Sequence, residues 1–259
     1  MTVESFNRFM AYNTKIKRFP GSNSIQVKTY SWTIDEEQKQ PIKPDTPKVY
    51  DDVRKAQKKA ILSEKSSLRR TQNAVYDIAR ANEKSWEWFV TITFNPEKVN
   101  SFDYDEVTKK VTNYFNRMRK SNPNMIYLGV PEKHKSGRYH FHFLMGQCEK
   151  LEMTDSGHKT KNGQPIYNIG SYRLGFSTAT RIENKARCTS YICKYITKDL
   201  YEHTKNKKRY WCSKNVLRPE EETLLLDLNE YSFAEECDYH KHIDIPSISQ
   251  SMDIFEYNG

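Results

Sequence analysis

Apolar residues recur along the middle of the chain with two different periods, and each period predicts a different kind of element. Residues 86–94 are rich in β-branched and aromatic side chains and end at an Asn-Pro pair, which is typical of a strand. Residues 103–120 carry apolar side chains three or four positions apart, which predicts an amphipathic helix. Residues 125–132 and 138–146 predict two further strands, joined by a polar turn that contains Gly137.

Weaker patterns flank this region. On the N-terminal side, residues 24–34 alternate weakly and favour a strand, the proline-containing stretch 41–47 favours a linker, and residues 48–82 favour a basic helix. On the C-terminal side we expect a Gly- and Asn-rich loop over 155–171, a short strand over 172–178, a helix over 184–201, and a short helix or strand over 224–228.

The order of these elements predicts an α+β fold with a central antiparallel sheet of about five strands and flanking helices. A chain of 259 residues accommodates one full domain with appendages, or two small domains. We expect an N-terminal extension with an extended segment and a basic helix (1–70), a central domain (71–218) and an acidic C-terminal tail (219–259).

Charge is distributed unevenly along the chain. It has 42 Lys and Arg against 33 Asp and Glu, a net charge of +9. Residues 219–259 hold eleven acidic residues and one basic residue, so this segment carries −10 and the other 218 residues carry +19. So basic a body is typical of a polyanion binder, although a solvated basic surface gives the same count.

Composition excludes several classes of protein. A hydrophobic share of 36% with 13% aromatic residues is enough for a core, which excludes a wholly disordered chain. No stretch approaches the roughly 20 apolar residues of a membrane span, and residues 1–17 lack the apolar run of a secretory signal. The five cysteines form no C-x-x-C pair, which argues against a disulfide framework and a zinc ribbon. We therefore expect a reducing cytoplasm and no membrane partner.

A His-x-His pair within a predicted strand indicates a metal site. His140 and His142 lie two positions apart, so both imidazoles point to the same face. If the two strands pair as a hairpin centred near Ser136, Glu132 lies opposite His140 and adds a carboxylate. Two imidazoles and a carboxylate suit Mg²⁺ or Mn²⁺, with open positions for phosphate oxygens. The alternative is two half-exposed strand histidines beside an exposed glutamate.

Other histidines are weaker candidates. His134 lies close enough to the hairpin turn to be a minor alternative ligand. His240 and His242 also form a His-x-His pair, but Lys241 separates them and no strand pattern surrounds them in the acidic tail. We therefore discount this second pair as a metal site.

Tyrosines and lysines gather in the expected helix over 184–201. Tyr191, Tyr195 and Lys198 lie at positions i, i+4 and i+7, which share one helix face, and Lys194 lies at its edge. A free tyrosine has a pKa of about 10 and is a poor nucleophile at neutral pH. A nearby ammonium, or a metal that polarises a target phosphate, lowers the barrier for its attack. The alternative is a surface stripe of solvated tyrosines and lysines.

Together and in this order, the motifs resemble those of rolling-circle replication initiators (Rep) of the HUH endonuclease superfamily, of the phage or plasmid type. Residues 89–94 resemble the first family motif, residues 140–142 the HUH motif, and residues 191–198 the third motif in its two-tyrosine form. The resemblance covers roughly residues 86–218. The phosphate-binding loop of the helicase domain that many viral initiators carry is absent from the sequence.

The resemblance implies an HUH/RRM-like sheet and a metal-dependent DNA nickase and strand transferase in the cytoplasm of a bacterial host. Glu132, His140 and His142 would hold Mg²⁺ or Mn²⁺ against the scissile phosphate of single-stranded or hairpin origin DNA. A tyrosine would become linked to the 5′-phosphate, and the freed 3′-OH would prime a DNA polymerase after a separate helicase has unwound the duplex. We favour Tyr195 as the nucleophile and Tyr191 as the second candidate.

In this reading Lys194 and Lys198 hold the phosphate or steady the phenolate. Basic residues after the tyrosine motif would track the DNA backbone: Lys205, Lys207, Lys208, Arg209, Lys214 and Arg218. Tyr210 and Trp211 are available for base stacking, although Trp211 fits the core equally well. The alternatives are a non-catalytic DNA-binding replication-control protein, or a transposase or relaxase with the same chemistry.

Overall fold

The computed structural model describes residues 11–35, 40–41, 52–204, 206–246 and 248–258, with the backbone alone at 40–41, 52–62, 198 and 201. The chain forms an α+β protein with two antiparallel sheets, which confirms the expected fold class. It divides into a central unit, Asp51–Arg218, and a terminal unit that combines Met1–Tyr50 with Pro219–Gly259.

The central unit is built on an antiparallel sheet in the strand order β10-β5-β6-β4-β9-β8-β7. Its strands are β4 (Trp88–Ile92), β5 (Ile126–Lys133), β6 (Tyr139–Gly146), β7 (Met153–Lys159), β8 (Pro165–Ile169), β9 (Ser177–Arg181) and β10 (Trp211–Cys212). The sheet has seven strands where the sequence predicts about five, because β7 and β8 extend one side and β10 the other.

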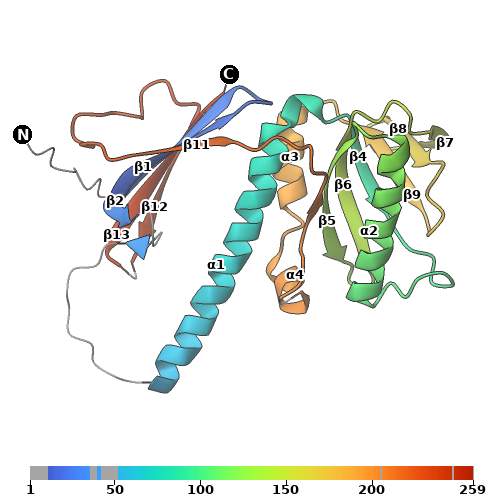
Figure 1. Ribbon diagram of the computed structural model, residues 1–259, viewed down its shortest axis with the longest axis horizontal. Coiled ribbons are helices and arrows are strands. Elements are labelled where there is room, and N and C mark those ends of the chain that lie inside the picture. Colours follow the sequence, from blue (N-terminus) through green and yellow to red (C-terminus); the bar gives the residue numbers. More distant parts are fainter. Residues whose placement is uncertain (1–10, 36–39, 42–51, 205, 247, 259) are drawn as a thin grey trace, which may run out of the picture. The chain divides into compact units, whose positions relative to one another are not determined.

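Helices cover both faces of this sheet, as Figure 1 shows. They are α1 (Asp52–Ala81), the short 3-10 helix η1 (Glu83–Ser85), α2 (Tyr104–Ser121), α3 (Lys185–Cys193) and α4 (Lys198–His203). On one face, the apolar stripe of α2 packs on Phe141 and Phe143 of β6. On the other, α1 and α3 pack on Leu128 and Leu144. The alternation of β6 therefore sends its phenylalanines to α2 and its histidines to the α3 side.

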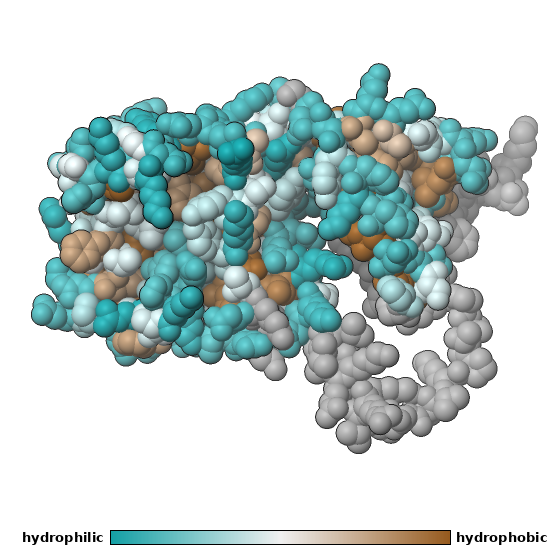
Figure 2. All heavy atoms as spheres, turned by 180° about the vertical axis from the view of Figure 1, so that it is seen from behind, coloured by the Kyte–Doolittle hydropathy of each residue, from teal (hydrophilic) through white to brown (hydrophobic). Residues whose placement is uncertain are grey.

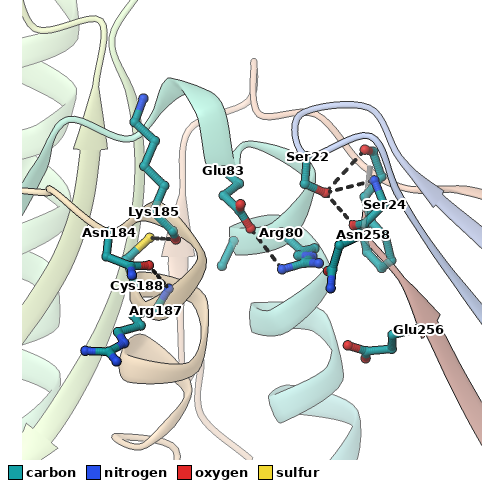
Figure 3. Close-up of polar contacts among 12 residues, drawn as sticks. Ser22, Ser24, Arg80, Glu83, Asn184, Lys185, Arg187, Cys188, Glu256 and Asn258 are labelled. Atoms are coloured by element: carbon teal, nitrogen blue, oxygen red, sulfur yellow. Dashed lines mark hydrogen bonds and ion pairs between the residues drawn. The ribbon is translucent and has the colours of Figure 1, made fainter. Parts of the chain in front are cut away.

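Local side-chain contacts fix the ends of these helices. The carboxylate of Asp103 accepts hydrogen bonds from the first backbone amides of α2, and Asn184 caps α3 through the amide of Arg187 (Figure 3). At the end of α1, Arg80 and Glu83 form an ion pair with an N–O distance of 3.1 Å (Figure 3). The helices that flank the site are thus anchored close to the sheet.

The terminal unit is a second antiparallel sheet, in the strand order β11-β1-β2-β13-β12 with β3 paired to β2. Its strands are β1 (Ala11–Phe19), β2 (Ser24–Asp35), β3 (Gln40–Pro41), β11 (Glu220–Leu224), β12 (Tyr239–Ile245) and β13 (Gln250–Tyr257). A turn with a short Ser22–Ser24 hydroxyl contact joins β1 to β2 (Figure 3).

Residues 219–259 do not form the separate acidic tail that the sequence suggests. Their strands pair with β1 and β2, and acidic side chains of β11 meet bases of β1. Glu221 lies 2.5 Å from Lys15 and 3.1 Å from Lys17. The unit boundary accordingly falls at residues 50–51, so α1 belongs with the central sheet rather than with the N-terminal extension.

Two further sequence expectations are wrong. The expected loop 155–171 contains the hairpin of β7 and β8, whose bulge and turn are made by Gly157 and Gly163 with φ of +73° and +82°. The expected strand 172–178 is displaced to β9, because Tyr172 turns inward and its hydroxyl donates to the Thr93 carbonyl. Most of the expected linker 41–47 and the first residues of the expected helix 48–82 lie outside the described residues.

The β5–β6 pairing depends on a glycine at position 129. Gly129 lies opposite Phe143, and a Cβ added there would lie 1.9 Å from that ring. The ring thus occupies the space of a side chain, and the two strands can approach in register. We expect Gly129→Ala to lower the free energy of unfolding by about 1–3 kcal/mol, because the added methyl overpacks the core.

Urea unfolding of the purified protein measures this loss. The double variant Gly129→Ala, Phe143→Leu provides the control, since a smaller residue at 143 makes room for the methyl. It should lose less stability than the two single variants combined, and simple additivity would contradict the packing explanation.

Candidate functional site

Three side chains meet on the α3-facing side of the β5–β6 hairpin. The register pairs Glu132 directly with His140, as the sequence predicts. The Nε2 atoms of His140 and His142 each lie 2.7 Å from the same carboxylate oxygen of Glu132. These three ligand atoms lie within 4.8 Å of one another, so one ion could contact all of them.

Burial controls the charge of this cluster. His142 is only 6% exposed, and its burial lowers its pKa to about 4 despite the nearby carboxylate. It is therefore a neutral imidazole at pH 7, the form that binds metals. Burial raises the pKa of Glu132, but hydrogen bonds from His142 and His140 outweigh burial and hold the pKa below its usual value. The carboxylate is accordingly ionised.

Thr91 orients the buried histidine. It lies opposite His142 in the β4–β6 pairing, and its Oγ1 is 3.0 Å from His142 Nδ1. This contact occupies the nitrogen that faces away from the cluster and leaves Nε2 for the ligand position. Sequence reasoning missed Thr91, although its place in the strand 86–94 offered a signal once that strand is paired with the His-x-His strand.

The donor set fits a divalent ion. Two neutral imidazole nitrogens and an ionised carboxylate converge on one point, and the Glu132 side chain remains partly exposed. Such a mixed set suits metals of the Mg²⁺ and Mn²⁺ class that keep open positions. His134, the minor alternative, instead has its Nδ1 2.9 Å from the Ser136 hydroxyl and is not part of the cluster.

Two tyrosines lie beside the cluster. The ring of Tyr195 stacks on the imidazole of His142, with centroids 3.7 Å apart and an interplanar angle of 17°. Tyr191 meets Tyr195 edge-on at 5.6 Å and also packs against Phe89 of β4. Tyr191 is 44% exposed, whereas Tyr195 is half-buried. The structure thus brings both tyrosines of the motif to the candidate metal ligands.

The environment of Tyr195 favours its neutral form. Burial raises its pKa above the ordinary value, and the hydrogen bond with Tyr191 and the charge of Glu132 act in the same direction. A positive charge introduced at the cluster would oppose the effect of Glu132. The phenol is therefore held neutral by the same groups that form the ligand set.

The tyrosines do not lie on one continuous helix as predicted. α3 ends at Cys193, and its last turn tightens, with the amide of Ile196 donating to the Cys193 carbonyl. The hydroxyl of Thr197 then accepts from the amide of Leu200 and begins α4. Gln72 of α1 satisfies the Ile196 carbonyl exposed by this break. The break turns Tyr195 toward His142.

The lysines of the motif are placed differently from each other. Lys194 caps α3, and its ammonium lies 5.2 Å from the Tyr191 ring centroid. Lys198 begins α4, but its side chain lies outside the described part of the chain.

The basic residues expected to track DNA are scattered. Lys207 pairs with Asp105 at 2.7 Å, and Arg209 binds Thr204 and Ser67 in a structural role. Trp211 is buried in the core and is not available for stacking. Lys205 lies outside the described residues, Lys208 lies over the Trp211 ring, Lys214 is exposed, and Arg218 contacts Cys212.

A basic groove lies next to the tyrosines instead. Its volume is about 710 Å³, and Phe89 and Tyr191 form part of its wall. Three cationic side chains line it, Arg181, Arg187 and Lys194, and of these the motif analysis selected only Lys194. Arg181 also lies over the Trp88 ring, 3.9 Å from its centroid. The charges converge only after β9 and α3 have packed together, so no local pattern along the chain marks them as a group.

Charge separates the two units. The central unit contains 33 basic and 17 acidic residues, a net charge of +16, whereas the terminal unit carries −7. Figure 2 shows a face on which hydrophilic side chains predominate and hydrophobic ones form small separate patches. Among the described residues, no helix is long and apolar enough to cross a membrane.

One family model matches the chain. Residues 87–200 match a family of replication-associated proteins of the ORF2 type. The match supports a role as a replication initiator. The matched segment includes all three members of the candidate metal cluster and both tyrosines. No curated protein and no solved structure matches the chain.

The cluster predicts divalent-metal binding that isothermal titration calorimetry with Mn²⁺ can measure. Glu132→Gln should abolish measurable binding because it removes the only carboxylate of the cluster. Thr91→Val should weaken binding by about tenfold, since it keeps all ligands and removes only the orienting contact.

The matched control is His240→Ala, His242→Ala, which removes the other His-x-His pair. That variant should bind Mn²⁺ as the unchanged protein does. Equal loss in the control and in Glu132→Gln would contradict the assignment.

Proposed function

We propose that this protein is a rolling-circle replication initiator that nicks and transfers single-stranded origin DNA through a phosphotyrosine intermediate, with HUH-type chemistry. The observation that carries the proposal is the stacking of Tyr195 on the candidate ligand His142. This contact puts a nucleophile side chain next to a cluster of two imidazoles and a carboxylate. We further propose that the central unit is the nuclease, because it holds all of these groups.

Glu132, His140 and His142 would hold Mg²⁺ or Mn²⁺, which when bound supplies Lewis-acid polarisation of the scissile phosphate. The side chains of this chain do the rest. Thr91 keeps His142 in the ligand orientation, and burial keeps that imidazole neutral. The Glu132 carboxylate completes the donor set.

In the proposed step, the Tyr195 oxygen forms a bond to phosphorus while the bond to the 3′-oxygen breaks. The phenol loses its proton and the departing 3′-oxygen gains one, so the products are a 5′-phosphotyrosine and a free 3′-OH. Reversal of the step with a new 3′-OH rejoins a strand. Tyr191 is placed to cut a second time while Tyr195 carries the first end, because the two rings are in contact.

Lys194 extends the site toward the DNA backbone. With Arg181 and Arg187 it lines the groove beside Tyr191, where phosphates would exchange counterions for fixed cations. The 3′-OH would prime a DNA polymerase, and a separate helicase would supply the single strand. These partners belong to the proposal.

A covalent-adduct assay tests the chemistry. The protein is incubated with a pool of single-stranded DNA labelled at the 3′ end, with Mn²⁺ or EDTA, and separated on a denaturing gel. We expect a Mn²⁺-dependent labelled protein band that Tyr195→Phe reduces at least about a hundredfold, since the nucleophile is lost. Tyr191→Phe should retain a first cut, and the double variant should give no band.

Tyr239→Phe is the matched control, because Tyr239 is similarly exposed and lies in the terminal unit. It should leave the band unchanged. A folded, DNA-binding protein that forms no adduct across a pool containing its site would overturn the nickase proposal.

The basic groove predicts the salt dependence of DNA binding. Arg187→Gln, Lys194→Gln should reduce the slope of log K against log salt by roughly 1.4, because two phosphate contacts to single-stranded DNA are lost. Fluorescence anisotropy in EDTA measures this without cleavage. Lys109→Gln, Lys120→Gln on α2 removes the same charge from the opposite face of the sheet, and an equal change in slope there would argue against the groove.

A further inference from the structure

A cavity of about 500 Å³ adjoins the candidate metal cluster on the side away from the tyrosine groove. Its wall includes the ligand His140 and the orienting residue Thr91. The remaining lining comes from the segment after β4, the turn between β5 and β6, and the residue before β9. Its volume lies in the range of ligand pockets. A group bound here would lie directly beside the group held at the cluster.

An exposed aromatic ring borders this cavity. Phe176 is 82% exposed, although its backbone carbonyl accepts a hydrogen bond of 2.9 Å from the amide of Thr93. The ring is therefore exposed on a fixed backbone rather than on a free loop end. Phe94 and Tyr139, both buried, add apolar surface to the lining. An exposed phenyl ring on a fixed support is suited to stack on a flat ligand.

A buried polar group in the lining lacks a partner. Ser101 is 2% exposed, and its hydroxyl has no hydrogen-bond partner within the part of the chain that the structure describes. Its carbonyl, by contrast, accepts from the amide of Tyr139 at 2.7 Å. Buried hydroxyls are ordinarily satisfied, so this one points to a ligand that supplies the missing bond. Arg138 adds a positive charge to the same lining.

We propose that this cavity binds one unpaired nucleobase of the DNA, from the nucleotide next to the scissile phosphate. Phe176 stacks on the face of the base, and the hydroxyl of Ser101 hydrogen-bonds its polar edge. Arg138 meets the adjoining backbone phosphate. The combination of a π-face, a single polar group and a cation beside a phosphate-handling cluster fits a nucleotide better than a purely apolar ligand. This inference rests on the proposed function and adds base selection to it.

The test measures binding without cleavage. The full-length protein in EDTA is mixed with single-stranded 20-mers of random sequence, and bound molecules are sequenced over repeated rounds. The unchanged protein should enrich one base at one position. Ser101→Ala should reduce that enrichment about five- to tenfold while it binds the pool with similar affinity, because it removes the contact to the base edge. Phe176→Ala should weaken binding about tenfold through lost stacking.

A second measurement locates the base. 2-Aminopurine placed at the enriched position should lose fluorescence on binding to the unchanged protein and regain it in Phe176→Ala. Tyr231→Ala, an exposed aromatic residue of the terminal unit, should match the unchanged protein in both measurements.

The outcomes separate this inference from the proposed function. Adducts that form normally, with no base enrichment or with the same enrichment in both cavity variants, would overturn the base pocket and leave the nickase intact. Base enrichment that depends on Ser101, without any adduct, would support the pocket in a protein that binds but does not cut. Failure to bind any pool would overturn both.

Discussion

The register of one β-hairpin is the constraint on which the rest of the candidate site depends. Glu132 faces His140 only if β5 and β6 pair without a shift, and a slip by one residue would move both histidines to the opposite face. The close approach of Gly129 to the Phe143 ring favours this register, because any other alignment would place a side chain where the ring lies. Core packing on the α2 face therefore fixes the chemistry on the other face.

The same alternation links stability with electrostatics. Phe141 and Phe143 are buried under α2, and the intervening His142 is buried under Tyr195. A histidine within such a strand loses its proton readily, so the fold itself prepares a neutral ligand. Tyr195 both shields the imidazole from water and presents its own hydroxyl beside Tyr191. The helix break at residues 194–197 is what permits this arrangement.

Sequence patterns predicted the elements formed by neighbours in the chain. Alternation and spacing were enough for β4, α2 and the β5–β6 hairpin, and hence for Glu132, His140 and His142. The patterns failed where pairing joins distant segments, as for β12 and β13, whose polar residues are stabilised by strands more than 200 residues away. They also failed at the end of α3, where buried Ile192 and Ile196 continue the apolar period through a break that tertiary contacts impose. Thr91, Phe176 and Ser101 carry no motif, because their roles arise only from what the folded chain brings beside them.

The terminal sheet joins segments from before and after the central unit, which gives the chain an order of assembly. During synthesis, β1 and β2 emerge first, but β2 gains its neighbour β13 only after residues 250–257 have been made. The central unit is complete in the meantime and holds its own core. Topologically it is an insertion between β3 and β11, so the nuclease candidate matures ahead of the sheet that encloses it in sequence. A ribosome that stalls after residue 218 would thus release a basic, folded central unit without the acidic strands that lower the net charge of the chain.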